Sequence, residues 1–566
     1  MKKKAIKFIC MLLAVALLLP LGACNEVAKP DDEGGPTAYE KRDSSVVENG
    51  GPDLENEGDP DIYTEPDLGT SVQSIAPSGA MIAEYSEDYP GGYYEEPPFN
   101  TEEYSNVDEN GFRNVSTSPT STFSASVDTA SYANLRRMIN NGYGLEDFPT
   151  GAIRIEEFLN YFSYDFITPR AGEPFAMSAQ IADCPWNKDT RLLILGLQAQ
   201  NPSTTVGEGS NLVFLIDVSG SMENIDKLPL LKKSFSYLIE QLNPSDRVSI
   251  VTYAGNDRVV LEGAYASEKN VILDAIDNLS ANGSTAGAKG LKRAYEIAEK
   301  YYIEGGNNRI IMASDGDLNV GFSSESELAD YVSTKRETGV YLSVLGFGSG
   351  NYKDNKMKAI AQNGNGNYHY IDCIEEAQKV FGEDLTANLY SVADDVKIEL
   401  EFNPAYIKGY RLIGYETRQL THEDFTDDTK DAAELGAGHQ VIVAYEIVMK
   451  DSPFEIGGAP LKYQEQAMGI ENGDWFTISI RYKEPGTQTS KEVMFPFGKS
   501  SYTDSPDQDW VFASAVIEFG MIASQSDFVG TATLEEVIER AGAAEKSNQY
   551  RREFVQLVER LVSLSR

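Results

Sequence analysis

The chain contains little cysteine and little histidine, with four cysteines and three histidines among 566 residues. Four cysteines are too few for the disulfide scaffold of a chain this long. Spacing alone leaves a pairing of Cys184 with Cys373 open, but we expect two independent buried thiols. The scarcity of histidine argues against zinc sites and general-base catalysis. We expect His369 to pack in a core and His439 to cap a turn.

Long hydrophobic runs are also scarce. The apolar run from Phe8 to Leu19 is too short for a comfortable membrane span, and no later segment approaches the roughly 18 uncharged apolar residues that a span requires. Four lysines precede this run and small residues follow it, so residues 1–24 fit a secretory signal with a cleavage site. The sequence Leu21-Gly22-Ala23-Cys24 resembles the lipobox of bacterial lipoproteins. This resemblance implies that Cys24 becomes the lipidated N-terminus of an exported, membrane-anchored protein.

Positive charge is low, with 48 Lys and Arg against 88 Asp and Glu and a formal net charge of -40. Residues 25–110 hold 23 acidic and three basic residues, which gives -20 and therefore half of the total. This segment mixes Pro, Gly, Ser and acids without helical or strand periodicity, as expected of a disordered acidic linker that extends by self-repulsion. The chain lacks a basic stripe that could neutralise phosphates, which argues against nucleic-acid binding.

A change of pattern near residue 211 predicts an α/β domain over residues 206–390. Short, almost entirely apolar segments alternate with amphipathic ones, as in βαβ units whose parallel sheet is covered on both faces. The predicted strands are 211–216, 247–253, 258–261, 309–313, 341–345 and 368–371. The predicted helices are 228–242, 271–278, 287–302, 326–337 and 375–390. We therefore expect a doubly wound, mostly parallel sheet of the Rossmann-like kind.

The segments on both sides of this domain are predicted to be rich in β-strand. The N-terminal flanking domain, residues 111–205, is expected to contain helices at 129–140 and 153–161 and strands at 175–181 and 191–197. The C-terminal β-rich domain, residues 391–566, shows the period-two alternation of strands. Its predicted strands are 396–402, 410–415, 440–449, 476–482 and 492–497, and three helices follow them.

Two features of the flanks lead to packing hypotheses. Because strands are few before the α/β domain and many after it, the flanks could form one β-sandwich into which that domain is inserted. The last predicted helix has apolar residues at i, i+3, i+4 and i+7, which is typical of a stripe that faces a core. These residues are Phe554, Leu557, Val558 and Leu561.

Three oxygen-bearing side chains follow the first predicted strand of the α/β domain. Asp217, Ser219 and Ser221 alternate with Val218 and Gly220, so that a tight loop can turn three oxygens toward one point. In open α/β sheets, ligands bind at this carboxyl edge of the strands. Mg²⁺ prefers oxygen ligands in near-octahedral geometry at about 2.0–2.1 Å. The pattern alone is weak, because it arises by chance with a probability on the order of one in ten in a chain this long.

Two further side chains occur in the order that a metal site of this kind requires. Thr285 lies in a Gly-rich segment before a predicted helix, and Asp315 follows the fourth predicted strand. Together with Asp217, Ser219 and Ser221, they resemble the metal ion-dependent adhesion site of von Willebrand A domains. The resemblance implies that the two serines bind the ion directly and that Thr285 binds it directly or through water. The two aspartates are implied to act mainly through water.

The same resemblance implies a cofactor and a partner. The ion would be Mg²⁺ or another divalent cation such as Mn²⁺ or Ca²⁺. Neutral hydroxyl ligands leave much of the ion's charge uncompensated, so the open coordination position favours a carboxylate. The implied function is adhesion-like binding of an Asp or Glu presented by another protein, without catalysis.

The regions outside the α/β domain carry a second resemblance. They are similar to the flanks of a bacterial family of exported von Willebrand A lipoproteins, the YfbK-like group, over about residues 115–566. The family pattern does not account for the acidic linker. The motifs that carry the resemblance are Arg154-Ile155-Glu156-Glu157, Cys184-Pro185-Trp186, Asn403-Pro404, Tyr410-Arg411-Leu412-Ile413-Gly414-Tyr415-Glu416 and Gly436-Ala437-Gly438-His439.

The same residues could serve other functions. An envelope scaffold, in which the metal site binds a carboxylate of its own chain, would use the same ligands. A metal-dependent phosphatase is disfavoured, because its second acid would stand two residues after Asp217, where the sequence has Ser219. Asp315 does not begin an EF-hand calcium loop, because the sixth position is Val320 rather than Gly and the twelfth is Ser326 rather than Glu.

Overall fold

The computed structural model describes residues 100–201, 209–254, 256–282, 287–316, 324–457, 469–545 and 547–565. The predicted signal, Cys24 and residues 25–99 of the predicted linker lie outside the described residues. The linker prediction is wrong at its C-terminal end, because residues 100–110 pack on the folded part of the chain. The Thr101 N–H donates to the carbonyl of Gly350 over 2.8 Å, and Arg137 donates two hydrogen bonds of 2.9 Å to the Glu102 carboxylate. The Arg137 guanidinium offsets the repulsion between acidic side chains that would otherwise keep this segment extended.

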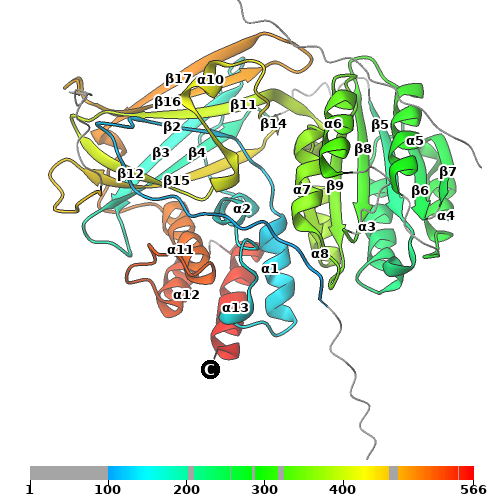
Figure 1. Cartoon of the computed structure of the whole chain (residues 1–566), viewed down its shortest axis with the longest axis horizontal. Helices are drawn as coiled ribbons and strands as arrows, with labels where there is room; N and C mark the ends of the chain where they lie inside the picture. The colour runs from blue at the N-terminus through cyan, green and yellow to red at the C-terminus, as the bar shows by residue number, and fades with distance from the viewer. Residues whose placement is uncertain are drawn as a thin grey trace, which may run out of the picture. The chain divides into compact units, whose positions relative to one another are not determined.

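The α/β part is built on a six-stranded sheet in the order β10-β9-β8-β5-β6-β7 (Figure 1). Its strands are β5 (Ser210–Asp217), β6 (Arg247–Ala254), β7 (Asn256–Tyr265), β8 (Asn307–Ser314), β9 (Tyr341–Phe347) and β10 (Tyr368–Ile371). Neighbouring strands are parallel, except that β7 is antiparallel to β6. The predicted doubly wound, mostly parallel sheet is confirmed.

Helices cover both faces of this sheet. They are α3 (Leu228–Gln241), α4 (Lys269–Asp277), α5 (Gly287–Lys300), α6 (Glu325–Arg336), α7 (Asp354–Asn363), α8 (Ile374–Gln378) and α9 (Leu385–Leu389). Along β5, Val213 and Leu215 share a core with α5, α6 and α7, whereas Leu212 and Phe214 share a core with α3 and α4. Successive side chains of a strand point to opposite faces, so a sheet covered on both sides needs apolar residues at nearly every position.

Two helical segments of the α/β part differ from the prediction. Helix α7 was not predicted, because its apolar stripe of Met357, Ile360 and Ala361 is short and stands among polar residues. The single helix expected over 375–390 is instead α8, a π-helical turn η4 (Lys379–Glu383) and α9. The Asn388 side chain donates to the carbonyl of Val380 over 3.0 Å and so bridges the break between the last two pieces.

The flanking strands form two sheets, ordered β1-β12-β15-β4-β3 and β13-β2-β11-β16-β17, with β14 beside β11. The strands from the N-terminal flank are β1 (Arg113–Asn114), β2 (Thr120–Ser124), β3 (Phe175–Asp183) and β4 (Arg191–Ala199). Those from the C-terminal flank are β11 (Ser391–Phe402), β12 (Ile407–Ile413), β13 (Gln419–Leu420), β14 (Ala433–Gly436), β15 (Gln440–Met449), β16 (Asp474–Lys483) and β17 (Ser490–Gly498). Strand β2 was not predicted.

Each of the two sheets combines strands from before and after the α/β part. Strand β4 pairs with β15, and β2 pairs with β11, both antiparallel. Apolar residues of both sheets, among them Leu195 of β4 and Ile398 of β11, belong to one buried cluster. The hypothesis of a single β-sandwich with the α/β part inserted in it is confirmed, and the two flanks therefore share one core.

A layer of helices covers the outer face of the first sheet (Figure 1). It contains α1 (Ala130–Asn140), α2 (Ile155–Tyr161), α11 (Gln508–Ala523), α12 (Leu534–Ala543) and α13 (Gln549–Leu564), while the short α10 (His422–Thr426) lies against β2 and β11. The predicted stripe of α13 is buried in this layer. Helix α1 joins two cores, because Leu135 packs in the helical layer and Ala133 in the core of the α/β part.

Buried charges also tie the inserted part to the helical layer. Arg154, which precedes α2, donates to the carboxylate of Asp354 at the start of α7 over 2.8 Å. Lys358 of α7 donates to Glu157 of α2 over 2.9 Å. All four side chains are buried. Each cation has an anion within hydrogen-bond distance, which is the condition under which buried charges are tolerated.

We expect Phe554→Ala to destabilise the protein by about 3–5 kcal/mol, because it empties a fully buried site in the helical layer. The Phe554 ring lies 5.3 Å from that of Phe519 and 5.6 Å from that of Phe512, centroid to centroid. Leu564→Ala, at a 40% exposed position of the same helix, should cost less than about 0.5 kcal/mol. Urea unfolding of both variants measures the difference, and equal losses would contradict this packing.

Glu518 of α11 predicts a pH dependence of stability. Its side chain is buried, and burial raises its pKa from 4.5 to about 7, although Arg540 beside it opposes the shift. The folded protein therefore binds more protons than the unfolded chain between these values, so this group's stabilisation is lost as the pH rises from 4.5 through 7. The stability of Glu518→Gln relative to wild type should increase between pH 5 and pH 8 in urea unfolding. Parallel pH curves would contradict this assignment.

Candidate metal centre

Two aspartates lie at the same edge of the α/β sheet. Asp217 is the last residue of β5, and Asp315 directly follows β8. The two strands are adjacent and parallel, with Ile216 opposite Ala313. From β5 the chain first builds β6 and β7 on one side and later β8, β9 and β10 on the other. The connections that leave β5 and β8 therefore run to opposite sides of the sheet. Open α/β sheets bind ligands in the crevice that forms at such a position.

The loop after β5 is held by backbone hydrogen bonds. The Val218 N–H donates to the carbonyl of Tyr253 over 3.1 Å, and the Asn282 N–H donates to the carbonyl of Val218 over 2.7 Å. The Ser219 N–H donates to Oδ1 of Asp217 over 2.9 Å, and the Ser219 and Ser221 hydroxyl oxygens lie 3.0 Å apart. The Ser219 hydroxyl therefore lies beside the Asp217 carboxylate, and the Ser221 hydroxyl lies beside that of Ser219.

The two carboxylates are removed from water, since Asp217 is 0% and Asp315 1% exposed. Burial raises the pKa of the Asp217 carboxyl to about 7, and the nearby Asp315 carboxylate adds to this rise, whereas the hydrogen bonds from Ser219 oppose it. Ser314 also donates to Oδ2 of Asp217 over 3.2 Å. The ionised form of Asp217 is therefore disfavoured in this site unless a cation lies nearby.

One cation of the chain already lies in this site. Lys227 Nζ donates to Oδ2 of Asp315 over 2.8 Å, and its side chain is 4% exposed. Neither Lys227 nor Ser314 was predicted as part of the site. Nothing in the sequence marks them, because a lysine before a helix and a serine at the end of a strand are ordinary residues at those positions.

The fifth predicted ligand, Thr285, lies in the segment 283–286, outside the described residues. Its described neighbours are close to the site: Asn282 is bonded to Val218 in the loop after β5, and α5 begins at Gly287. The structure thus brings together Asp217, Ser219, Ser221 and Asp315 and leaves the position of Thr285 as a prediction.

The donors of this site are oxygen atoms. Among the described residues, no three or more His, Cys, Asp or Glu side chains are grouped so that they could hold a metal ion. The described donors are two carboxylates and two hydroxyls, which suit hard cations. The Ser219 and Ser221 oxygens lie 3.0 Å apart, which is a hydrogen-bond distance and is also short enough for both oxygens to contact one ion.

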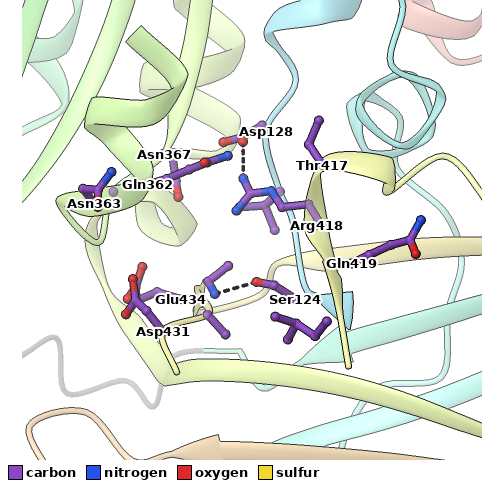
Figure 2. Close-up of a pocket in the computed structure, with 15 residues that line it drawn as sticks. Ser124, Asp128, Gln362, Asn363, Asn367, Thr417, Arg418, Gln419, Asp431 and Glu434 are labelled. Carbon is purple, nitrogen blue, oxygen red and sulfur yellow. Dashed lines mark hydrogen bonds and ion pairs between the residues drawn. The ribbon is translucent and has the colours of Figure 1, made fainter. Parts of the chain in front are cut away.

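A polar pocket of about 240 Å³ lies elsewhere, between the loop after α7 and the sandwich (Figure 2). The described metal-site residues do not line it. Arg418 pairs with Asp128 over 2.6 Å, and the Ala433 N–H donates to the Ser124 hydroxyl over 2.9 Å. Because these groups bind one another, we interpret the pocket as a polar seam between the inserted part and the sandwich.

The histidines and cysteines have the structural roles expected from the sequence, with one difference. His369 is buried, with Nδ1 3.1 Å from the Thr129 hydroxyl, and His439 accepts a hydrogen bond from the Gly436 N–H over 3.0 Å within a turn. Cys184 and Cys373 are both free thiols. Cys184 is buried as predicted, whereas Cys373 is half-buried.

Three family models match consecutive parts of the chain. The "von Willebrand factor" model matches residues 98–194, the "von Willebrand factor type A domain" model 211–383, and "Uncharacterized protein YfbK, C-terminal" 387–564. The uncharacterized protein YfbK of Escherichia coli (strain K12) is 39% identical over 471 residues, which cover 81% of each chain. The chain belongs to the YfbK family of von Willebrand A proteins. The inserted α/β part is the von Willebrand factor type A domain of this family.

More distant similarities cover smaller parts of the chain. The uncharacterized protein sll0103 of Synechocystis is 28% identical over 216 residues, which are 37% of this chain and 50% of that protein. A solved structure, a von Willebrand factor type A protein of Catenulispora acidiphila, is 16% identical with a TM-score of 0.39 and covers 68% of this chain and 89% of that chain. Within the described residues, no helix is both long and apolar enough to cross a membrane.

Mg²⁺ should stabilise the protein, and Asp217→Ala should abolish this effect. A ligand that binds only the folded state at 100 times its Kd adds about 2.7 kcal/mol. The quantity to compare is the response to Mg²⁺, because in EDTA the variant loses both a buried like charge and the hydrogen bonds that Asp217 accepts from Ser219 and Ser314. Glu223→Ala, at an exposed position in the same loop, should keep the full response. Thermal unfolding with and without Mg²⁺ measures this, and an unchanged response of Asp217→Ala would rule out the site.

Proposed function

We propose that this protein is a surface-anchored binding module that recognises an Asp or Glu of a partner protein through a divalent cation. Asp217, Ser219, Ser221, Thr285 and Asp315 would hold the ion, and Cys24 would carry the lipid that anchors the chain outside the cytoplasm. The partner's carboxylate would fill the open coordination position. No catalytic step is assigned to the site.

The observation that carries this proposal is the pair of serine hydroxyls beside a buried aspartate. Ser219 and Ser221 Oγ lie 3.0 Å apart, next to the carboxylate that accepts from the Ser219 N–H. Two neutral ligands leave a divalent ion with much of its charge uncompensated, so that it attracts a further anionic oxygen. A binding function follows from this charge balance, whereas a phosphatase would need an acid at the position of Ser219.

An envelope scaffold, in which a carboxylate of the same chain completes the site, is the second candidate. Residues 101–103, at the C-terminal end of the predicted linker, lie alongside residues 350–353. Its acids are engaged there, because Glu102 pairs with Arg137 and Glu103 with Lys353. This pairing favours a carboxylate from another protein over these two.

Capture experiments with the mature chain, made without lipid, test the proposal. Immobilised protein in Mg²⁺ should retain a partner from envelope extract, and EDTA should release it. Asp217→Ala should retain nothing, whereas Glu223→Ala should behave as wild type. Amidation of the carboxylates in the extract with carbodiimide and an amine should prevent capture.

The outcomes separate the two candidates. Capture that survives EDTA and Asp217→Ala would refute a metal-mediated interaction. If the ligand is instead supplied by residues 25–99, a chain that begins at residue 100 should capture more partner than the mature chain. Equal capture by both chains is expected for a carboxylate that comes only from another protein.

A further inference from the structure

Lys227 is a buried cation at the proposed metal centre. It directly precedes α3, and its ammonium lies 2.8 Å from Oδ2 of Asp315. The side chains of Lys227 and Asp315 are 4% and 1% exposed. Lysine is seldom buried unless its charge is paired. This ion pair therefore belongs to the buried interior of the site and is not a surface contact.

The surrounding chain is shaped to admit the lysine. Gly348, just after β9, has a φ of +76°, and a Cβ there would lie 2.4 Å from Cγ and Cε of Lys227. The lysine stem therefore occupies space that any other residue at position 348 would fill. The backbone of Lys227 is fixed as well, because its N–H donates to Asn224 over 3.0 Å and its carbonyl accepts from Leu231 over 2.8 Å.

From this geometry we infer that Lys227 is the resident counter-cation of the metal centre and sets its affinity for divalent ions. The inference rests on the proposed metal site. In the metal-free protein the ammonium neutralises one of the two buried carboxylates. When a divalent ion enters, it meets a positive charge that already shares Asp315, and this like-charge repulsion in a water-poor site weakens its binding.

Removal of the charge should therefore tighten metal binding. Lys227→Gln keeps a hydrogen-bond donor without the charge, and Lys227→Met keeps an unbranched stem. Both variants should lower the Kd for Mg²⁺ and Mn²⁺ at least tenfold in isothermal titration calorimetry on the mature chain. Lys233→Met, an exposed position of the same helix, is the matched control and should leave the Kd unchanged.

Thermal unfolding supplies an independent readout. In EDTA, Lys227→Met should melt at a lower temperature than wild type, because the buried Asp315 carboxylate loses its ion pair with Lys227. Mg²⁺ should raise the melting temperature of this variant more than that of wild type. The double variant Lys227→Met with Asp315→Asn should recover stability in EDTA, because neither charge remains. Lys227→Gln is the milder change and is suited to calorimetry if Lys227→Met folds poorly.

The two possible failures are distinguishable. If wild type binds Mg²⁺ and the Lys227 variants bind it with an equal or weaker affinity, Lys227 supports the ion instead of opposing it, and this inference is overturned while the metal site stands. If neither wild type nor any Lys227 variant binds Mg²⁺ or Mn²⁺, the proposed metal site itself fails.

Discussion

Two buried carboxylates at the end of adjacent parallel strands are the constraint around which the functional edge of this protein is organised. Asp217 and Asp315 are almost inaccessible to water, and like charges held close together in such a place are costly. The Asp217 carboxylate accepts from the Ser219 N–H in the loop after β5 and from the Ser314 hydroxyl at the end of β8, and the Asp315 carboxylate accepts from the ammonium of Lys227, just before α3. A bound metal ion would be a second cation that stabilises the same two carboxylates.

The surrounding architecture ties the α/β part to the rest of the fold at several places. The α/β part is inserted in a sandwich whose sheets need strands from both flanks, since β4 pairs with β15 and β2 with β11. Helix α1 contributes to two cores, and the buried pair of Arg154 with Asp354 links the inserted part to the helical layer. Shared strands, a shared helix and a buried ion pair therefore fix the inserted part to the sandwich and to the helical layer.

Local patterns predicted the regular elements well where apolar periodicity is strong. The strands of the α/β sheet and the stripe on α13 were predicted because burial on two faces, or on one, dictates which positions are apolar. Short elements among polar residues were missed, as with α7 and β2. The linker was extended too far because composition does not reveal that Glu102 meets Arg137, which is 35 residues away.

The sequence by itself determined the doubly wound class, the family resemblance and the position of Asp217, Ser219, Ser221 and Asp315 at strand ends, because these follow from local patterns. The structure alone decided which charges meet. That Lys227 reaches Asp315, 88 residues away, depends on how α3 packs against the sheet and on the space left by Gly348. Contacts between distant segments arise from packing in three dimensions, which periodicity and spacing do not encode.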